Sequence, residues 1–217
     1  MVEATFIIFM KLHYFEFYGR AEPIRLLLSH AGVQFDDVRH KMEDWPELKQ
    51  KSEQFELGQL PVLEKDGKNY CQAMAILRYL GASHGYLPED AEQLYRVDRL
   101  MDLLSDFCVS IFKLRHVTEP EEQKTMFGEL CETHYPKYFG YWEKELKSNS
   151  SQEFLVGDKA SIVDFAYLAV YGSFINHGMG KEMVLSILKN FPTLQEYFEK
   201  RWEAQKDHFD NRPECPY

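Results

Sequence analysis

Short apolar runs alternate with helix-like stretches over the first 83 residues of this 217-residue chain. Phe6–Phe15 is rich in Phe, Ile and Tyr, as a buried strand is. Arg20–Ala31 has a helical pattern with Pro23 in its first turn, the one place where a helix accepts proline. Val33–Arg39 can form a second strand, so the pattern predicts a strand–helix–strand unit.

A hairpin and a helix are predicted next. Asp66-Gly67 is the strongest short hairpin signal in the chain and lies between Pro61–Glu64 and Lys68–Tyr70. Gln72–Leu80 then returns to a helical pattern before Gly81. This order of elements is the layout of a thioredoxin-like α/β domain, with helices on a mixed four-stranded sheet.

Longer helical patterns fill the rest of the chain. One runs over Glu121–Leu146 with a bend expected near Pro136, and the last spans Pro192–Ala204. Another starts at Ser161, where Asp164 completes a near capping box. The first is marked by apolar residues at steps of three and four, namely Leu94, Val97, Met101, Leu104, Cys108 and Ile111.

We therefore expect a thioredoxin-like domain at 1–83 with an extension at 1–9, a linker at 84–92, and an all-α helical-bundle domain at 93–217. The net charge of −10 is divided unevenly. Residues 1–83 carry 10 basic and 12 acidic groups, which leaves 15 and 23 for the remainder. A strongly acidic chain without a basic stripe cannot neutralise phosphates, so nucleic acid is excluded as a partner.

The sequence indicates a cytoplasmic protein without a membrane segment. Its longest apolar stretch near the start, Phe6–Met10, is far shorter than the ~20 residues of a membrane helix, and no basic region precedes it. The cysteines are scattered without a CxxC pair, which is typical of reduced thiols and not of a disulfide or zinc framework. They are Cys71, Cys108, Cys131 and Cys215.

Six short motifs, in order from residue 12 to residue 164, carry a family resemblance. Each alone is weak, but together they cover nearly the whole chain. The chain resembles the cytosolic glutathione transferases, most closely the sigma-type branch with its glutathione-dependent prostaglandin isomerases. The motifs are Leu12-His13-Tyr14-Phe15, Gly19-Arg20-Ala21-Glu22, Trp45-Pro46-Glu47-Leu48-Lys49, Gln59-Leu60-Pro61, Gln72-Ala73-Met74-Ala75-Ile76 and Gly157–Asp164.

Glutathione chemistry needs the thiolate, yet a free thiol with a pKa of about 8.5 is only a few per cent ionised at neutral pH. A hydroxyl donor aimed at the sulfur stabilises the anion. The resemblance assigns that role to Tyr14, at the end of the first predicted strand, and places Arg20 near the sulfur. Composition alone would favour a core tyrosine at Tyr14, whereas for Arg20 a solvated charge in the first helical turn is an equal alternative.

The resemblance also implies a frame that holds the tripeptide. Leu60 precedes Pro61, a cis proline in the family, and its backbone pairs with the cysteinyl backbone of glutathione. Trp45 and Lys49 close over the glycyl end, where Lys49 offers charge to the carboxylate. Gln59 stands where many relatives have a lysine, so one cation is absent there.

The start of the helix at Gln72 offers free backbone N–H groups to the γ-glutamyl carboxylate. Relatives have a Gln-Ser pair at this point, whereas this chain has Gln72-Ala73. A hydrogen bond to a charged group contributes about 1.5–3 kcal/mol. We therefore expect weaker glutathione binding than in a typical relative, though not its loss.

Asp98, Asp102 and Asp106 lie four residues apart and so share one helix face. The resemblance implies a homodimer in which Asp106 reaches the glutathionyl ammonium of the neighbouring subunit; a solvated acidic face is the alternative. Ser105 stands where some sigma-type relatives have an acidic residue beside a divalent cation, so no metal is predicted.

The second substrate is a small hydrophobic electrophile, for which an apolar pocket is expected. We take Phe15, Phe17 and Ile111 as its candidate walls. The sequence thus indicates a glutathione transferase with roles in detoxification. The alternatives are a non-catalytic binding or structural protein of crystallin or ligandin type, and a glutathione-dependent prostaglandin-type isomerase. A thiol oxidoreductase ranks low, because no cysteine opens the first helix.

Overall fold

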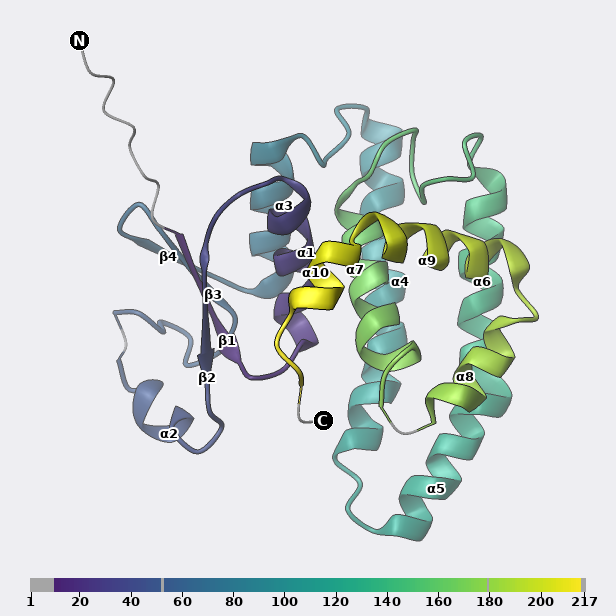
Figure 1. Ribbon diagram of the computed structural model, residues 1–217, viewed down its shortest axis with the longest axis horizontal. Coiled ribbons are helices and arrows are strands. Elements are labelled where there is room, and N and C mark those ends of the chain that lie inside the picture. The colour runs from purple at the N-terminus through teal and green to yellow at the C-terminus, as the bar shows by residue number, and fades with distance from the viewer. Residues whose placement is uncertain (1–9, 52, 179, 216–217) are drawn as a thin grey trace.

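The computed structural model describes residues 10–51, 53–178 and 180–215. The extension expected at 1–9 lies outside these residues. Figure 1 shows a small α/β domain, in purple and blue, beside a larger helical domain in teal, green and yellow. This is the combination of domains that the sequence predicts.

A mixed four-stranded sheet with the order β2-β1-β3-β4 forms the centre of the N-terminal domain. β1 pairs parallel to β2 and antiparallel to β3, and β3 and β4 form an antiparallel hairpin. The hairpin turns at Asp66 and Gly67, which both have the positive φ of a tight two-residue turn. The strands are β1 (Met10–Phe15), β2 (Asp36–His40), β3 (Val62–Lys65) and β4 (Lys68–Cys71).

Helices connect these strands and separate the sheet from the helical domain (Figure 1). A single 3₁₀ turn, η1, leads into the first long helix, so the helical segment begins at Gly19, one residue before the predicted start at Arg20, and takes its α form at Glu22. The elements are η1 (Gly19–Ala21), α1 (Glu22–His30), α2 (Trp45–Leu48) and α3 (Ala73–His84).

The C-terminal domain is helical throughout its regular elements. Two five-residue π-helical turns, η2 and η3, interrupt or extend its α-helices. Its elements are α4 (Ala91–Arg115), α5 (Pro120–Glu129), η2 (Leu130–His134), α6 (Tyr135–Ser148), α7 (Ile162–Val170), η3 (Tyr171–Ile175), α8 (Lys181–Leu188), α9 (Pro192–Ala204) and α10 (Lys206–Asn211).

Several element boundaries differ from the sequence expectation. β2 begins at Asp36 and not at Val33, and α10 was not predicted. α3 continues through Gly81 to His84 and ends at Gly85, whose left-handed φ caps the helix; Gly81 instead allows close packing, since a methyl group there would collide with the Ile162 side chain of α7. The expected bend near Pro136 is instead the π-helical turn η2, and Pro136 lies in the first turn of α6, where it removes no needed N–H.

A buried carboxylate organises the start of α7. Asp164 is 2 % exposed and accepts hydrogen bonds from the backbone N–H of Ser161 at 2.8 Å and of Leu155 at 3.1 Å. The hydroxyl of Tyr197 on α9 also donates to it at 2.8 Å. Asp164 therefore fixes the loop before α7 as well as the helix end, which extends the capping box predicted from the sequence.

A second buried carboxylate joins the first long helix, α1, to the C-terminal segment of the chain. Glu22 of α1 is fully buried and accepts hydrogen bonds from His208 at 2.9 Å and from Arg212 at 2.7 Å. Arg25 adds a third cationic contact at 3.3 Å. Burial alone would raise the pKa of Glu22, but the His208 hydrogen bond and the charges of Arg25 and Arg212 lower it to about 2. The network holds α10 against α1.

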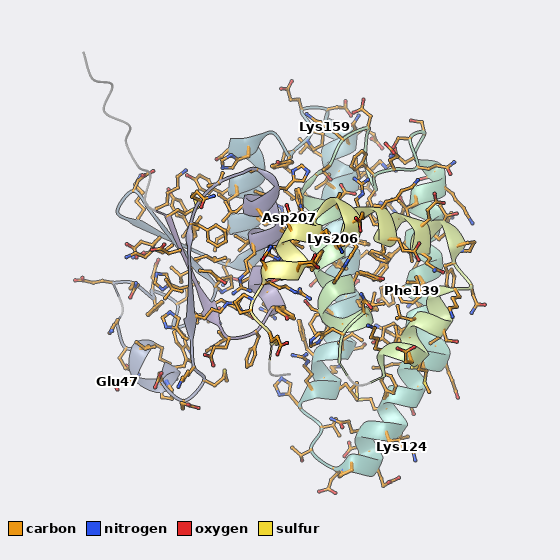
Figure 2. All side chains as sticks on the ribbon, in the orientation of Figure 1. Glu47, Lys124, Phe139, Lys159, Lys206 and Asp207 are labelled. Carbon is orange, nitrogen blue, oxygen red and sulfur yellow. The ribbon has the colours of Figure 1, made fainter. Side chains whose placement is uncertain are left out.

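Figure 2 places Lys206 and Asp207, the first residues of α10, at the junction between the two domains. Gln205, just before α10, donates a long hydrogen bond of 3.4 Å to the carbonyl of Leu26. α1 of the N-terminal domain also packs against α7 of the C-terminal domain, so each domain contributes helices to their junction. Among the described residues no helix is long and apolar enough to cross a membrane.

Candidate active site

Tyr14 stands at the junction of the two domains. Its hydroxyl accepts a hydrogen bond from the backbone N–H of Arg20 at 3.1 Å, and its side chain is 8 % exposed. Gly19 makes this approach possible, since it has φ +43° and a methyl group there would lie 2.7 Å from the Tyr14 Oη. Burial raises the pKa of Tyr14, although the Arg20 N–H and nearby arginines oppose it. The phenol therefore remains protonated at neutral pH and can donate.

A cavity of about 230 Å³ lies immediately beside Tyr14, between the domains. Gly19 and Arg20, the two residues that contact the tyrosine hydroxyl, belong to its lining. The N-terminal domain also contributes Pro23 and the start of α3, and the helical domain contributes α4, α7 and η3. The lining residues are Gly19, Arg20, Pro23, Gln72, Ala73, Met74, Met101, Leu104, Ser105, Cys108, Val109, Phe112, Ala166, Ala169, Val170 and Phe174.

The start of α3 faces this cavity. Gln72 has a positive φ of 71°, and no side chain caps the helix, so the first backbone N–H groups of α3 lack a capping side chain. The Gln72 amide donates to the Gln59 side chain at 3.2 Å, which ties α3 to the segment before β3. The Leu60–Pro61 peptide bond in that segment is cis, as the resemblance implies.

Trp45 and Lys49 lie on α2 and at its end, outside the cavity lining as far as the chain is described. The Trp45 ring packs edge-on against Phe15 at 5.6 Å and Phe55 at 5.2 Å. The Lys49 side chain is exposed. The two residues therefore form a separate edge of the N-terminal domain.

Phe15 and Phe17 also lie apart from the described lining of the cavity. Phe15, the last residue of β1, packs edge-on against both Trp45 and Tyr14, with ring centroids 5.6 Å apart in each pair. Phe17 lies 6.0 Å from Phe15, centroid to centroid. Proximity to Tyr14 in the sequence thus does not place either ring in the described cavity.

Ile111 and Asp106 take opposite positions on α4. Ile111 is 5 % exposed and packs in the core, whereas the neighbouring Phe112 reaches the cavity. Asp106 is exposed. Of the acidic row, Asp98 has a cationic partner in the same chain, the Arg78 guanidinium of α3 at 2.8 Å.

Sequence reasoning missed the part of the cavity wall that comes from α7 and η3. Ala166, Ala169, Val170 and Phe174 lie in an almost uniformly apolar segment, which carries no signal to separate wall from core. Met101, Leu104 and Cys108 belong to the predicted apolar stripe of α4, but the stripe itself does not tell which members border a cavity.

Cys108 is a thiol inside this cavity wall. Burial raises its pKa to about 12, although the charge of Arg20 acts in the opposite direction. The side chain therefore stays protonated at neutral pH and is a poor nucleophile. The described residues contain no group of three or more His, Cys, Asp or Glu side chains arranged to hold a metal ion.

The fold and this interdomain cavity are typical of enzymes that bind glutathione on a thioredoxin-like domain and a second substrate against a helical domain. Family models for the glutathione S-transferase N-terminal and C-terminal domains match residues 10–82 and 105–206. The chain belongs to the glutathione S-transferase family, and it is a glutathione transferase.

Relatives of this family match the chain over nearly its full length. Glutathione S-transferase 1 of Ascaris suum is 31 % identical over 218 residues, which cover 95 % of this chain and 98 % of the relative. A sigma class transferase structure from Fasciola hepatica has a TM-score of 0.84 at 26 % identity, covering 97 % and 100 %. A prostaglandin synthase D structure from Nilaparvata lugens has a TM-score of 0.81 at 29 % identity, covering 95 % and 99 %.

Proposed function

We propose that the Tyr14 hydroxyl donates a hydrogen bond to the glutathione sulfur and stabilises the thiolate, which attacks the electrophilic carbon of a small hydrophobic substrate. The observation that carries this proposal is the position of the hydroxyl. It accepts the Arg20 N–H, stands beside the interdomain cavity and stays protonated at neutral pH. A neutral donor lowers the pKa of a neighbouring thiol because it binds the anion more strongly than the thiol.

Glutathione would lie along the edge formed by the segment 59–61 and the start of α3. The free N–H groups at Ala73 would bind the γ-glutamyl carboxylate, aided by the Gln72 and Gln59 amides. The backbone of Leu60, next to Pro61, would pair with the cysteinyl residue.

The remaining contacts to glutathione are assigned by the family resemblance. Arg20 would lie near the sulfur, while Trp45 and Lys49 would close over the glycyl end. Asp106 of one subunit would reach the glutathionyl ammonium of its neighbour in a homodimer. We place this enzyme in the cytosol, with a role in detoxification.

The electrophile would occupy the part of the cavity that α4, α7 and η3 line. Apolar walls such as Leu104, Val170 and Phe174 suit substrates that share hydrophobicity and little else. These residues replace Phe15, Phe17 and Ile111 as our candidates for the wall. The nucleophile is supplied by glutathione, since Cys108 stays protonated.

The test is Tyr14→Phe, assayed with glutathione and 1-chloro-2,4-dinitrobenzene. Loss of one hydrogen-bond donor to a reacting anion typically lowers turnover by about a hundredfold. The ultraviolet absorbance of the bound thiolate should fall in parallel, while the Kd for glutathione changes by less than about threefold. Tyr141→Phe, an exposed tyrosine on α6, is the control. Full activity in Tyr14→Phe would exclude this mechanism.

The same thiolate could serve a glutathione-dependent isomerase, and the likeness to the prostaglandin synthase D of Nilaparvata lugens supports testing this second function. Adding an endoperoxide to the substrate panel separates the two functions. An isomerase would convert the endoperoxide far faster than it conjugates chlorodinitrobenzene, and a general transferase would do the reverse.

A further inference from the structure

Two arginines lie on aromatic rings at the edge of the proposed electrophile cavity. The guanidinium of Arg20 lies 5.5 Å from the ring centre of Phe112, and that of Arg115 lies 5.0 Å from the ring centre of Phe174. The two rings meet edge to face at 5.8 Å, and both belong to the cavity lining. Arg20, Phe112, Phe174 and Arg115 therefore form a continuous set, which we call the cationic rim.

Neither guanidinium in the cationic rim has an acidic partner among the described residues, and both side chains are exposed. Two other arginines on the helices are paired with carboxylates: the half-buried Arg78 with Asp98 at 2.8 Å, and the exposed Arg99 with Glu145 at 2.6 Å. The rim arginines thus keep their hydrogen-bond donors free for a ligand, while the aromatic rings below fix where each guanidinium lies.

The interior of the cavity has the opposite character. Met101, Leu104, Ala169 and Val170 line it, so the body of a ligand there meets apolar side chains. An apolar interior with cations at its edge complements a molecule that is hydrophobic over most of its length and anionic at one end. A neutral electrophile would use the interior and leave the rim unused.

We propose that the preferred electrophile carries a carboxylate, which Arg115 binds at the cationic rim while the hydrophobic body of the substrate fills the cavity. This inference rests on the proposed transferase function and names the class of its second substrate. Arg115 is the residue that carries it, because Arg20 also stands beside the proposed sulfur position through its backbone contact with Tyr14. The planar guanidinium suits a carboxylate, which it can bind through two parallel hydrogen bonds.

The charge of Arg115 influences titratable groups around the proposed reaction centre. It acts with Arg20 and Arg25 to oppose the rise in the pKa of Tyr14, and with Arg212 and Lys181 to lower the pKa of His177 beyond the effect of burial. The positive charges of Arg20 and Arg115 therefore act together at this edge of the cavity. An anionic substrate would be attracted there over roughly one Debye length, about 8 Å at physiological salt.

Two matched electrophiles test the proposal: 4-chloro-3,5-dinitrobenzoate and 4-chloro-3,5-dinitrobenzamide. In both, the glutathione sulfur bonds to the ring carbon and chloride leaves, so only the charge of the distal group differs. Rates are expressed relative to the uncatalysed reaction of each compound. Arg115→Gln should lower kcat/KM for the benzoate by about three- to tenfold more than for the benzamide, because any effect through Tyr14 is common to both substrates.

Lys113→Gln is the matched control, because Lys113 is an exposed cation in the same last turn of α4. It should change neither substrate, and Arg115→Lys should retain part of the preference for the benzoate. Raising the salt concentration should shrink that preference in the wild type. Equal effects of Arg115→Gln on both substrates, or an equal effect of Lys113→Gln on the benzoate, would overturn the proposal.

The outcome separates this inference from the proposed function. If the benzamide is turned over but Arg115→Gln has no specific effect on the benzoate, the transferase function stands and the carboxylate site is refuted. If neither compound is turned over, calorimetry with the unreactive 3,5-dinitrobenzoate and 3,5-dinitrobenzamide decides the question. If Arg115→Gln weakens binding of the benzoate and not of the benzamide, the carboxylate site is supported. If the wild type and Arg115→Gln bind the benzoate with equal affinity, the site is refuted.

Discussion

At the scale of single residues, Ala73 sets how this chain meets its first substrate. It lies at the first position of α3 and lines the interdomain cavity, with a methyl group where the family resemblance implies a serine hydroxyl. The backbone N–H of α3 remains, but a side-chain donor is absent. The site therefore has one hydrogen bond fewer for the carboxylate that we place there.

Ala73→Ser should strengthen glutathione binding. A hydrogen bond to a charged group contributes about 1.5–3 kcal/mol, which corresponds to a Kd about ten- to a hundredfold lower. Calorimetric titration of glutathione measures this directly. Ala75→Ser, at an exposed position of the same helix, serves as the control. An unchanged Kd in Ala73→Ser would mean that the hydroxyl has no partner in the bound tripeptide.

Some individual site residues could be predicted from the sequence and others could not. Tyr14 and Gln72 were predicted as site residues from motifs, and the structure places them at one interdomain junction. Phe15 neighbours Tyr14 in the sequence and packs against its ring, yet it lies outside the described lining of the cavity because its ring also packs against Trp45.

At the scale of elements, helices were easier to predict than their interruptions. Pro192–Ala204 was predicted with both ends as found, because the proline start and the amphipathic pattern are local signals. The end of α3 was predicted too early, before Gly81, whose role in the close approach of α7 is a tertiary contact. The π-helical turn η2 likewise has no local sequence signal apart from Pro136 shortly after it.

Asp164 links three elements, so we expect its loss to be felt across the helical domain. Asp164→Ala would leave the buried donors of Ser161, Leu155 and Tyr197 without an acceptor, and should lower the free energy of unfolding by about 3–5 kcal/mol. Urea denaturation measures the loss. Asp158→Ala, an exposed carboxylate in the preceding loop, should stay within about 0.5 kcal/mol of the wild type.

A loss in Asp164→Ala no larger than that in Asp158→Ala would contradict this account of the α7 start. Ser161→Ala gives an intermediate case, because it removes the hydroxyl at the helix cap and keeps the carboxylate. We expect it to lower the free energy of unfolding by about 1 kcal/mol.

At the scale of the whole molecule, the cavity could not be predicted from the sequence. Its walls come from the start of α3 and from α4, α7 and η3, which are brought together by the packing of α1 against α7. Of the residues predicted from motifs, Arg20, Gln72 and Ala73 line the cavity from the N-terminal domain, where chemistry constrains residue types. The helical half demands only apolar side chains of suitable shape, and these are indistinguishable from core residues in one sequence.

The Glu22 network should make the stability of the fold depend on pH in the acid range. The pKa of Glu22 is lowered from 4.5 to about 2 in the folded protein, so its contribution is present above the unfolded value and is lost as the pH falls toward 2. A shift of this size corresponds to about 3 kcal/mol. Urea denaturation between pH 7 and pH 2 measures it.

Glu22→Gln should lose about 3 kcal/mol at pH 7, and its difference from the wild type should shrink as the pH is lowered. Glu196→Gln removes an exposed carboxylate that pairs with Lys200, and it should follow the wild-type curve. If the difference between Glu22→Gln and wild type stays constant with pH, the ionised carboxylate is not the stabilising species.

The same network has a consequence for how the protein is made. Glu22 lies 186 residues before His208 and 190 before Arg212. During synthesis the first helix therefore leaves the ribosome long before the side chains that bind its buried carboxylate. An N-terminal domain that folds early, as domains generally do, must keep Glu22 hydrated or paired with Arg25 alone until the last helix arrives. Release of the completed chain, and not emergence of the first domain, then sets the moment at which Glu22 acquires its full set of partners.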